Sequence, residues 1–219
     1  VLLHQTINGN EAILQMEQTG DYPDIIVGCT GGGSNLAGLM FPFLGQQLRG
    51  GQKIDIIGCE PLSCPSFTKG TYAYDHGDMA RMTPLIKMHT LGSDFLPPAN
   101  HSGGLRYHGM SYHLSHLYNL GLMRAKAYGQ KDCFEAGVIF GKQEGIIPAP
   151  EGNHAVKGAI DAALECKEKG ESKTILFNLC GHGHFDMTAY DDYFNGRLAD
   201  DFYDENSVNQ SLSKLPEIA

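Results

Sequence analysis

Residues 24–38, DIIVGCTGGGSNLAG, constrain the fold of this chain more than any other segment. The apolar, β-branched run 24–29 predicts a buried strand, and three consecutive glycines separate it from a helix that opens on Ser-Asn. A glycine loop between a strand and a helix gathers unpaired backbone N–H groups at the positive end of the helix dipole, where no Cβ keeps an anion away. The segment therefore predicts a binding site for one phosphate group. Its candidate residues are Gly31, Gly32, Gly33, Ser34 and Asn35.

The loop differs from two other phosphate-binding motifs. It does not end in Gly-Lys-Ser/Thr, which excludes a nucleoside-triphosphate loop. It also lacks G-x-G-x-x-G, because Leu36 stands three positions after Gly33, so a dinucleotide site is unsupported. The alternative is a tight turn that binds nothing, although three glycines followed by Ser-Asn exceed what a turn requires.

Composition excludes several classes of partner for this chain of 219 residues. A net charge of −9 and the absence of any basic run argue against nucleic acid. No apolar stretch approaches 18 residues, so no membrane-spanning segment is predicted. The first residues show no signal peptide, and the six cysteines are scattered without a C-x-x-C pair. This pattern favours reduced thiols in a cytoplasmic protein.

Helix and strand signals alternate along the chain, which predicts an α/β fold with a parallel sheet. Residues 62–121 are rich in Gly, Pro, His, Ser and Thr, and we expect irregular loops there. Residues 1–199 would form the α/β domain, and 200–219 an acidic extension or a docked arm. The predicted strands are 24–29, 53–59 and 173–179; the predicted helices are 8–19, 34–49, one near 109–119, 132–143 with Asp132 as N-cap, and one that runs from about 155 to Gly170.

Three further residues merit attention because ligands of parallel sheets bind at the carboxyl ends of strands. Glu60 follows the second predicted strand and Cys180 follows the third. Glu151 lies at the start of a predicted helix. Each has a structural alternative: Glu60 as a surface loop residue, Cys180 as a small buried hydrophobe, and Glu151 as a carboxylate favoured by the helix dipole.

The ten histidines do not define a metal site. His113 and His116 share a predicted helix, and His182 and His184 precede Asp186, but no set of three or four ligands is evident. We therefore predict no metal. A serine nucleophile is also unsupported, because no G-x-S-x-G motif occurs.

Five motifs, in order, resemble the tryptophan synthase β chain, especially its second-type branch. The resemblance runs from Val1 to about Asp200 and implies a pyridoxal-phosphate enzyme of fold type II, with a three-layer, mostly parallel twisted sheet and helices on both faces. The motifs are CTGGGSN (29–35), GCEP (58–61), HSGGLRYHG (101–109), EGIIPAPEGNHA (144–155) and FNLCGHGHFD (177–186).

The resemblance also implies roles for individual residues. Residues 31–35 would bind the cofactor phosphate, and Glu151 would lie near the pyridine ring and its 3-hydroxyl. Cys180 stands where the β chain usually has a serine that faces the pyridine nitrogen, and a cysteine there is similar to the serine and threonine dehydratases. Arg106 stands where the first-type branch has an aspartate. The loop that closes over the substrate would include Gly103, Gly104, Arg106 and Tyr107.

One feature of the family has no counterpart. The Schiff-base lysine of these enzymes follows a histidine, and no lysine of this chain does. The chain resembles only the C-terminal half of a β chain, so we expect a fragment of a longer enzyme or one half of a split one, inactive alone. The implied partners are L-serine, indole, a second copy in a homodimer, an α-type subunit and a separate N-terminal half.

The function implied is β-replacement by a pyridoxal-phosphate-dependent carbon–oxygen lyase, which makes L-tryptophan from L-serine and indole. Two alternatives stay open. One is a serine or threonine dehydratase-like lyase, which Cys180 favours. The other is a non-catalytic module that only binds a phosphate-bearing ligand.

Overall fold

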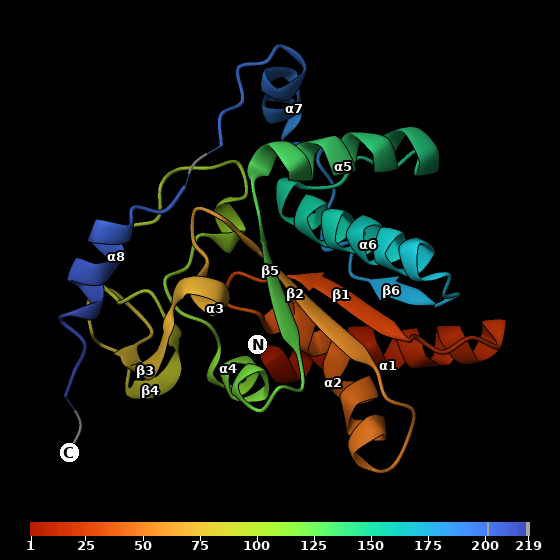
Figure 1. The fold of residues 1–219 in the computed structure, drawn as a ribbon, viewed down its shortest axis with the longest axis horizontal. Helices are drawn as coiled ribbons and strands as arrows, with labels where there is room; N and C mark the ends of the chain where they lie inside the picture. Colours follow the sequence, from red (N-terminus) through yellow and green to blue (C-terminus); the bar gives the residue numbers. More distant parts are fainter. Residues whose placement is uncertain (201, 218–219) are drawn as a thin grey trace.

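The computed structural model describes residues 1–200 and 202–217, and its centre is a parallel four-stranded sheet (Figure 1). The strands run in the order β5-β2-β1-β6, and every neighbouring pair is parallel. A separate antiparallel hairpin pairs β3 with β4. The strands are β1 Ile25–Cys29, β2 Asp55–Pro61, β3 Thr71–His76, β4 Leu85–Thr90, β5 Arg124–Tyr128 and β6 Ile175–Phe177.

Helices cover both faces of the sheet. Helices α1, α2 and α4 lie on one face, and α5 and α6 lie on the other (Figure 1). The predicted three-layer α/β architecture with a mostly parallel sheet is therefore confirmed. The helices are α1 Leu2–Thr19, α2 Ser34–Leu48, α3 Ser66–Lys69, the 3-10 turn η1 Gly103–Leu105, α4 Tyr112–Asn119, α5 Gln130–Glu144, α6 Pro150–Lys169, α7 Met187–Phe194 and α8 Glu205–Leu212.

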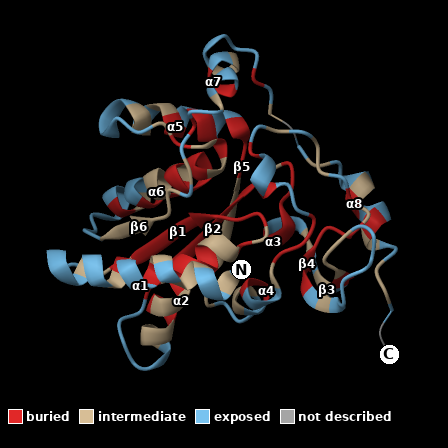
Figure 2. Cartoon of the chain, turned by 180° about the vertical axis from the view of Figure 1, so that it is seen from behind, coloured by how far each residue is buried: buried red, intermediate tan, exposed pale blue. Residues whose placement is uncertain are grey.

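The central strands form the core because both faces of the sheet are covered. All five residues of β1 are buried, as Figure 2 shows for the middle of the sheet. Ile26 and Ile56 pack toward α1 and α2, whereas Val27 and Ile57 pack toward α5 and α6. A strand that is apolar at every position fits a sheet buried on both sides.

Several predicted boundaries were displaced. The first helix begins at Leu2 rather than at residue 8, because Leu2 packs on the α1–α2 core and the Asn8-Gly9 pair, which looks like a helix breaker, lies inside the helix with Gly9 buried. The predicted N-cap Asp132 instead lies in the first turn of α5, whose N-cap is Gly129. Gly145 and Gly170 end α5 and α6 in the left-handed conformation, and Gly170 lies at the helix end that the sequence predicted.

Several elements in the segment 62–121 and just after it were not predicted, among them α3, the hairpin β3–β4 and β5. The hairpin β3–β4 lies where irregular loops were predicted, and β5 follows it at the sheet edge. β5 carries Arg124 and Lys126 among small residues, so its pattern is too polar for a buried strand. Its edge position explains this, because Arg124 pairs with Asp55 and both cations contact Glu165.

The tail contains a helix that docks on the domain. Figure 1 shows α8 beside the β3–β4 hairpin. Val208 of α8 is buried in a small apolar cluster with Cys64, Leu91 and Phe95. Helix α8, residues 205–212, therefore packs on the rest of the chain through its apolar side chains. Of the predicted extension 200–219, positions 201, 218 and 219 lie outside the described residues.

None of the helices in the described ranges is long and apolar enough to cross a membrane.

Candidate functional site

The glycine loop lies at the carboxyl end of β1, where parallel sheets place their ligands. β1 ends at Cys29 and α2 begins at Ser34, so the loop is only four residues long. Gly33 precedes the helix with φ of 89°, in the left-handed region that a side chain would strain. A Cβ on Gly33 would also lie 2.2 Å from Leu114 Cδ1. The sharp turn into α2 therefore requires glycine at this position.

The backbone N–H groups of this loop are available to a ligand. Across the described part of the chain, no acceptor takes a hydrogen bond from the N–H groups of residues 31–35. The carbonyl of Gly32 accepts from Ser111 N at 3.0 Å, which anchors the loop without using its donors. Free donors at a helix N-terminus, aided by the helix dipole, form an anion-binding site.

A second loop, which includes η1, covers the glycine loop. A Cβ on Gly31 would lie 2.6 Å from Gly104 O and 2.8 Å from Leu105 Cα. Gly104 N in turn donates a 2.8 Å hydrogen bond to Glu151 Oε1 in the first turn of α6. Glu151 thus connects α6 with the loop predicted to close over a substrate.

The end of β6 supplies the remaining wall. Cys29 Sγ and Cys180 Sγ lie 3.4 Å apart, and Cys180 is exposed whereas Cys29 is buried. The hydrogen bond from Cys29 lowers the pKa of the Cys180 thiol, and the same bond together with burial raises the pKa of the Cys29 thiol well above its usual value. The exposed Cys180 is therefore the thiol that ionises first.

Asn35 is fixed by a residue that sequence analysis did not select. Asn178 Nδ2, just beyond β6, donates to Asn35 Oδ1 at 2.6 Å. This bond holds the first turn of α2 against the strand that leads to Cys180. Only the position of Asn178 at a strand end could have suggested it, because the two residues are 143 positions apart.

These residues surround one cavity of about 230 Å³. It contains every cofactor-binding residue predicted from the sequence, together with Cys29 and Leu105, which were not predicted. A larger apolar groove between α2 and α4 lies elsewhere and holds none of the predicted cofactor-binding residues. The cavity is lined by Cys29, Gly31, Gly32, Gly33, Ser34, Asn35, Gly104, Leu105, Glu151 and Cys180.

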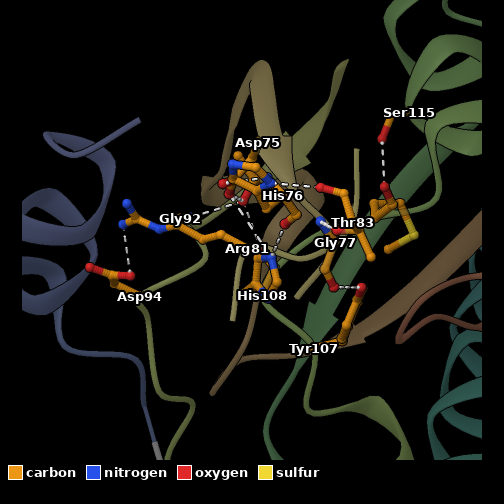
Figure 3. Close-up of polar contacts among 12 residues, drawn as sticks. Asp75, His76, Gly77, Arg81, Thr83, Gly92, Asp94, Tyr107, His108 and Ser115 are labelled. Atoms are coloured by element: carbon orange, nitrogen blue, oxygen red, sulfur yellow. Dashed lines mark hydrogen bonds and ion pairs between the residues drawn. The ribbon is translucent and has the colours of Figure 1, made fainter. Parts of the chain in front are cut away.

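The other predicted loop residues lie outside the cavity lining. Gly103 is exposed and has open space around it. Arg106 Nη2 donates to the carbonyl of Pro97 at 2.6 Å. The Tyr107 hydroxyl donates to the carbonyl of Gly77 beyond β3 (Figure 3). Arg106 and Tyr107 thus attach the loop to its surroundings.

A buried polar network joins this loop to the hairpin. Asp75 of β3 accepts from Thr90 Oγ1 at 2.7 Å and from His76 N at 2.8 Å. His108 Nε2 lies 2.9 Å from His76 O and 4.0 Å from Asp75 Oδ2 (Figure 3). The hairpin that the sequence did not predict therefore supports the predicted loop.

Glu60 and the histidines do not join the site. Glu60 was expected after a strand or on a surface loop, but it lies within β2, fully buried. Its carboxylate accepts hydrogen bonds from Phe67 N, Thr68 N and Thr68 Oγ1 at the start of α3. Burial raises the pKa of Glu60 to about 7. In the described residues, no group of three or more His, Cys, Asp or Glu side chains could hold a metal ion.

The lining of the cavity suits a ligand that carries a phosphate and further polar atoms. Free N–H groups at residues 31–35 suit the phosphate, and its charge would lie at the N-terminus of α2. The exposed thiol of Cys180 and the carboxylate of Glu151 line the same cavity and suit the further polar atoms of such a ligand.

The fold and this cavity define an α/β protein with a candidate phosphate site at the carboxyl end of a parallel sheet. The chain belongs to the family of pyridoxal-phosphate dependent enzymes, whose family model matches residues 5–181. The cofactor predicted from the sequence is thus the cofactor of its family.

Curated relatives confirm the resemblance to tryptophan synthase β chains. The chain is 58% identical to tryptophan synthase beta chain 2 of Aquifex aeolicus over 91% of its own length and 47% of the relative's. It is 57% identical to tryptophan synthase beta chain 2 of Methanosarcina mazei over 90% of its length and 45% of the relative's. It is 50% identical to the tryptophan synthase beta chain of Pyrococcus horikoshii over 99% of its own length and 46% of the relative's. The chain spans about half the length of the curated relatives it matches.

Solved structures confirm the fold class. A fungal L-serine ammonia-lyase from Rhizomucor miehei superposes with a TM-score of 0.60 at 16% identity, over 87% of this chain and 56% of that one. A threonine deaminase from T.th. gives a TM-score of 0.58 at 16% identity, over 83% of this chain and 56% of that one. At this identity the likeness concerns the fold alone.

Proposed function

We propose that this chain supplies the phosphate-binding half of a tryptophan synthase β-type enzyme, which converts L-serine and indole to L-tryptophan and water by β-replacement. The observation that carries the proposal is the set of free N–H groups at residues 31–35, which share one cavity with Glu151 and Cys180. Identity of 50–58% to tryptophan synthase β chains over most of the chain supports this reaction.

Each wall of the cavity would do a separate task. Residues 31–35 bind the cofactor phosphate through backbone donors. Cys180 would face the pyridine nitrogen, and Glu151 would lie beside the ring. When bound, pyridoxal phosphate supplies an electron-withdrawing ring that assists loss of the leaving group at Cβ of the amino acid.

The loop 103–107 would position the substrate and exclude water. The hydrogen bond from Gly104 N to Glu151 Oε1 couples the position of the loop to that of Glu151, the residue proposed to lie beside the ring. Arg106 and Tyr107 hold the loop to Pro97 and Gly77. The loop is thus attached at Gly104 and at its C-terminal end.

The remaining parts of the proposal concern organisation. Residues 1–199 form the cofactor-binding domain, with the tail 200–219 as its extension. The lysine that carries the cofactor comes from a separate polypeptide or from another part of a longer one. The working enzyme is a cytoplasmic homodimer that can associate with an α-type subunit.

The test is complementation. The chain is combined with a polypeptide that covers the part of the Aquifex aeolicus relative that it does not match, and supplied with pyridoxal phosphate, L-serine and indole. We expect L-tryptophan from the combination and none from either piece alone. L-Tryptophan from the isolated chain, or none from a combination shown to associate, contradicts the proposal.

Cys180 supports a second candidate, a serine or threonine dehydratase-like lyase. In the same assay, release of pyruvate from L-serine or of 2-oxobutanoate from L-threonine, faster than L-tryptophan formation, favours this candidate. A third, a non-catalytic binding module, is favoured by calorimetric binding of pyridoxal phosphate to a combination that turns over no substrate.

A further inference from the structure

Two thiols meet at the edge of the cavity, although they are 151 residues apart in the sequence. Cys29 ends β1, and Cys180 follows the neighbouring parallel strand β6. Their sulfur atoms are 3.4 Å apart, and a disulfide requires about 2.05 Å, with side chains on adjacent backbone segments.

The two thiols are chemically unequal in a way that suits oxidation. Cys180 is exposed to solvent and lines the cavity, whereas Cys29 is buried behind it. The hydrogen bond from Cys29 lowers the pKa of Cys180 and so raises its thiolate fraction. An exposed thiolate with a second thiol beside it combines an attacking and a resolving cysteine.

We propose that Cys29 and Cys180 form a site of reversible oxidative modification, in which a hydroperoxide converts the two thiols to a disulfide at the wall of the cavity. The Cys180 thiolate attacks the peroxide, the O–O bond breaks, and Cys180 becomes a sulfenic acid while hydroxide leaves. The Cys29 sulfur then displaces the sulfenic hydroxyl, which leaves as water with the Cys29 proton. The hydroxide takes up the proton that the Cys180 thiol released on ionising, so that overall two thiols are oxidised and one hydrogen peroxide is reduced to two waters.

The disulfide would change the cavity itself. It draws Cys180 toward the end of β1 and removes the S–H that lines the site beside Glu151. The other four cysteines are buried, and Cys59, the register partner of Cys29, contributes its sulfur to the packing against Gly158 of α6. The site is therefore specific to one pair.

The experiment treats the reduced chain of residues 1–219 with hydrogen peroxide and then counts thiols after unfolding. We expect the six thiols to fall to four, with a Cys29–Cys180 cross-link in the peptide map and full recovery after dithiothreitol. Cys180→Ser should retain its other five thiols over the same time. Cys29→Ala should accumulate a sulfenic acid at Cys180, trapped by a 1,3-dione, in place of a cross-link.

Cys166→Ala is the matched control, because Cys166 lies in α6 away from the cavity, and it should form the cross-link as the parent chain does. A cross-link between other cysteines, or identical thiol loss in the parent chain and in Cys29→Ala, overturns the inference. The inference is also overturned if the parent chain keeps all six thiols at a peroxide concentration at which Cys180 of the Cys29→Ala variant is oxidised.

A test of whether pyridoxal phosphate protects the two thiols from oxidation distinguishes failure of this inference from failure of the proposed function. Pyridoxal phosphate should slow cross-linking by about tenfold or more if its ring covers Cys180, whereas inorganic phosphate should not. Cross-linking without protection counts against the proposed function and leaves the thiol pair intact. If the chain binds pyridoxal phosphate but peroxide forms no cross-link in the chain free of pyridoxal phosphate, the result counts against the thiol pair alone.

Discussion

At the scale of single residues, the candidate phosphate site depends on the absence of one methyl group. Gly31→Ala places a Cβ 2.6 Å from Gly104 O, so the glycine loop or the loop above it must move. We expect an overpacking cost of about 1–3 kcal/mol and at least a tenfold weaker affinity for pyridoxal phosphate, measured by thermal unfolding and calorimetry.

Gly103→Ala is the control for this change. Gly103 belongs to the same covering loop but has no atom within 4 Å of an added Cβ. Its affinity should equal that of the parent chain, and its stability should differ by about 0.5 kcal/mol or less. Equal binding by both alanine variants would contradict the assignment of the phosphate to this loop.

Glu60 gives a prediction about pH. Its pKa rises from an ordinary 4.5 to about 7 because the carboxyl group is buried, although three hydrogen bonds oppose the shift. Between pH 4.5 and about pH 7 the folded chain therefore binds more protons than the unfolded chain. The contribution of the Glu60 carboxyl group to the free energy of unfolding is complete below pH 4.5 and is lost as pH rises through about 7. Between pH 4.5 and pH 8 the parent chain should lose about 3 kcal/mol relative to Glu60→Gln.

The measurement is urea unfolding of the parent chain and Glu60→Gln across this pH range. Comparison with the variant is needed because burial lowers the pKa of His154 to about 4, which acts in the opposite direction in both chains. A free-energy difference between the two chains that does not change with pH would contradict the burial of an ionisable Glu60.

At the scale of elements, the sequence predicted those whose signals are local. β1, the glycine loop and α2 follow from one uninterrupted pattern in residues 24–38. β5 and the β3–β4 hairpin could not be predicted in this way. β5 is stabilised by ion pairs with Asp55 and Glu165, and the hairpin by the Asp75 network, so their partners lie far away in the sequence.

The docking of α8 leads to the next prediction. Val208 is 3% exposed and packs in the cluster with Leu91. Truncation of its side chain removes two carbons from this cluster, so Val208→Ala should destabilise the chain by about 1–2 kcal/mol. Gln210→Ala, on the exposed face of the same helix, should cost about 0.5 kcal/mol or less. Chemical denaturation measures both, and equal effects would mean that α8 does not dock.

At the scale of the whole molecule, the site is assembled by topology. Cys29, Glu151 and Cys180 come from three distant segments that meet because parallel strands present their carboxyl ends at one edge. Position at a strand end or helix start marked Glu151 and Cys180 as candidates, but it marked Glu60 as well, and only the family resemblance gave Glu151 and Cys180 their roles. It could not reveal that Cys29 touches Cys180, since a contact across 151 residues leaves no local pattern.

The same topology predicts how the isolated chain binds pyridoxal phosphate. No lysine is among the residues that line the cavity in the described structure, so the cofactor's aldehyde has no amine of this site to react with. We expect reversible binding through the phosphate alone. Borohydride treatment followed by peptide mapping should find only scattered, substoichiometric labelling of surface lysines, and inorganic phosphate should compete for the site. Stoichiometric labelling of one lysine would show that this chain contains the amine that the proposed function assigns to another polypeptide segment.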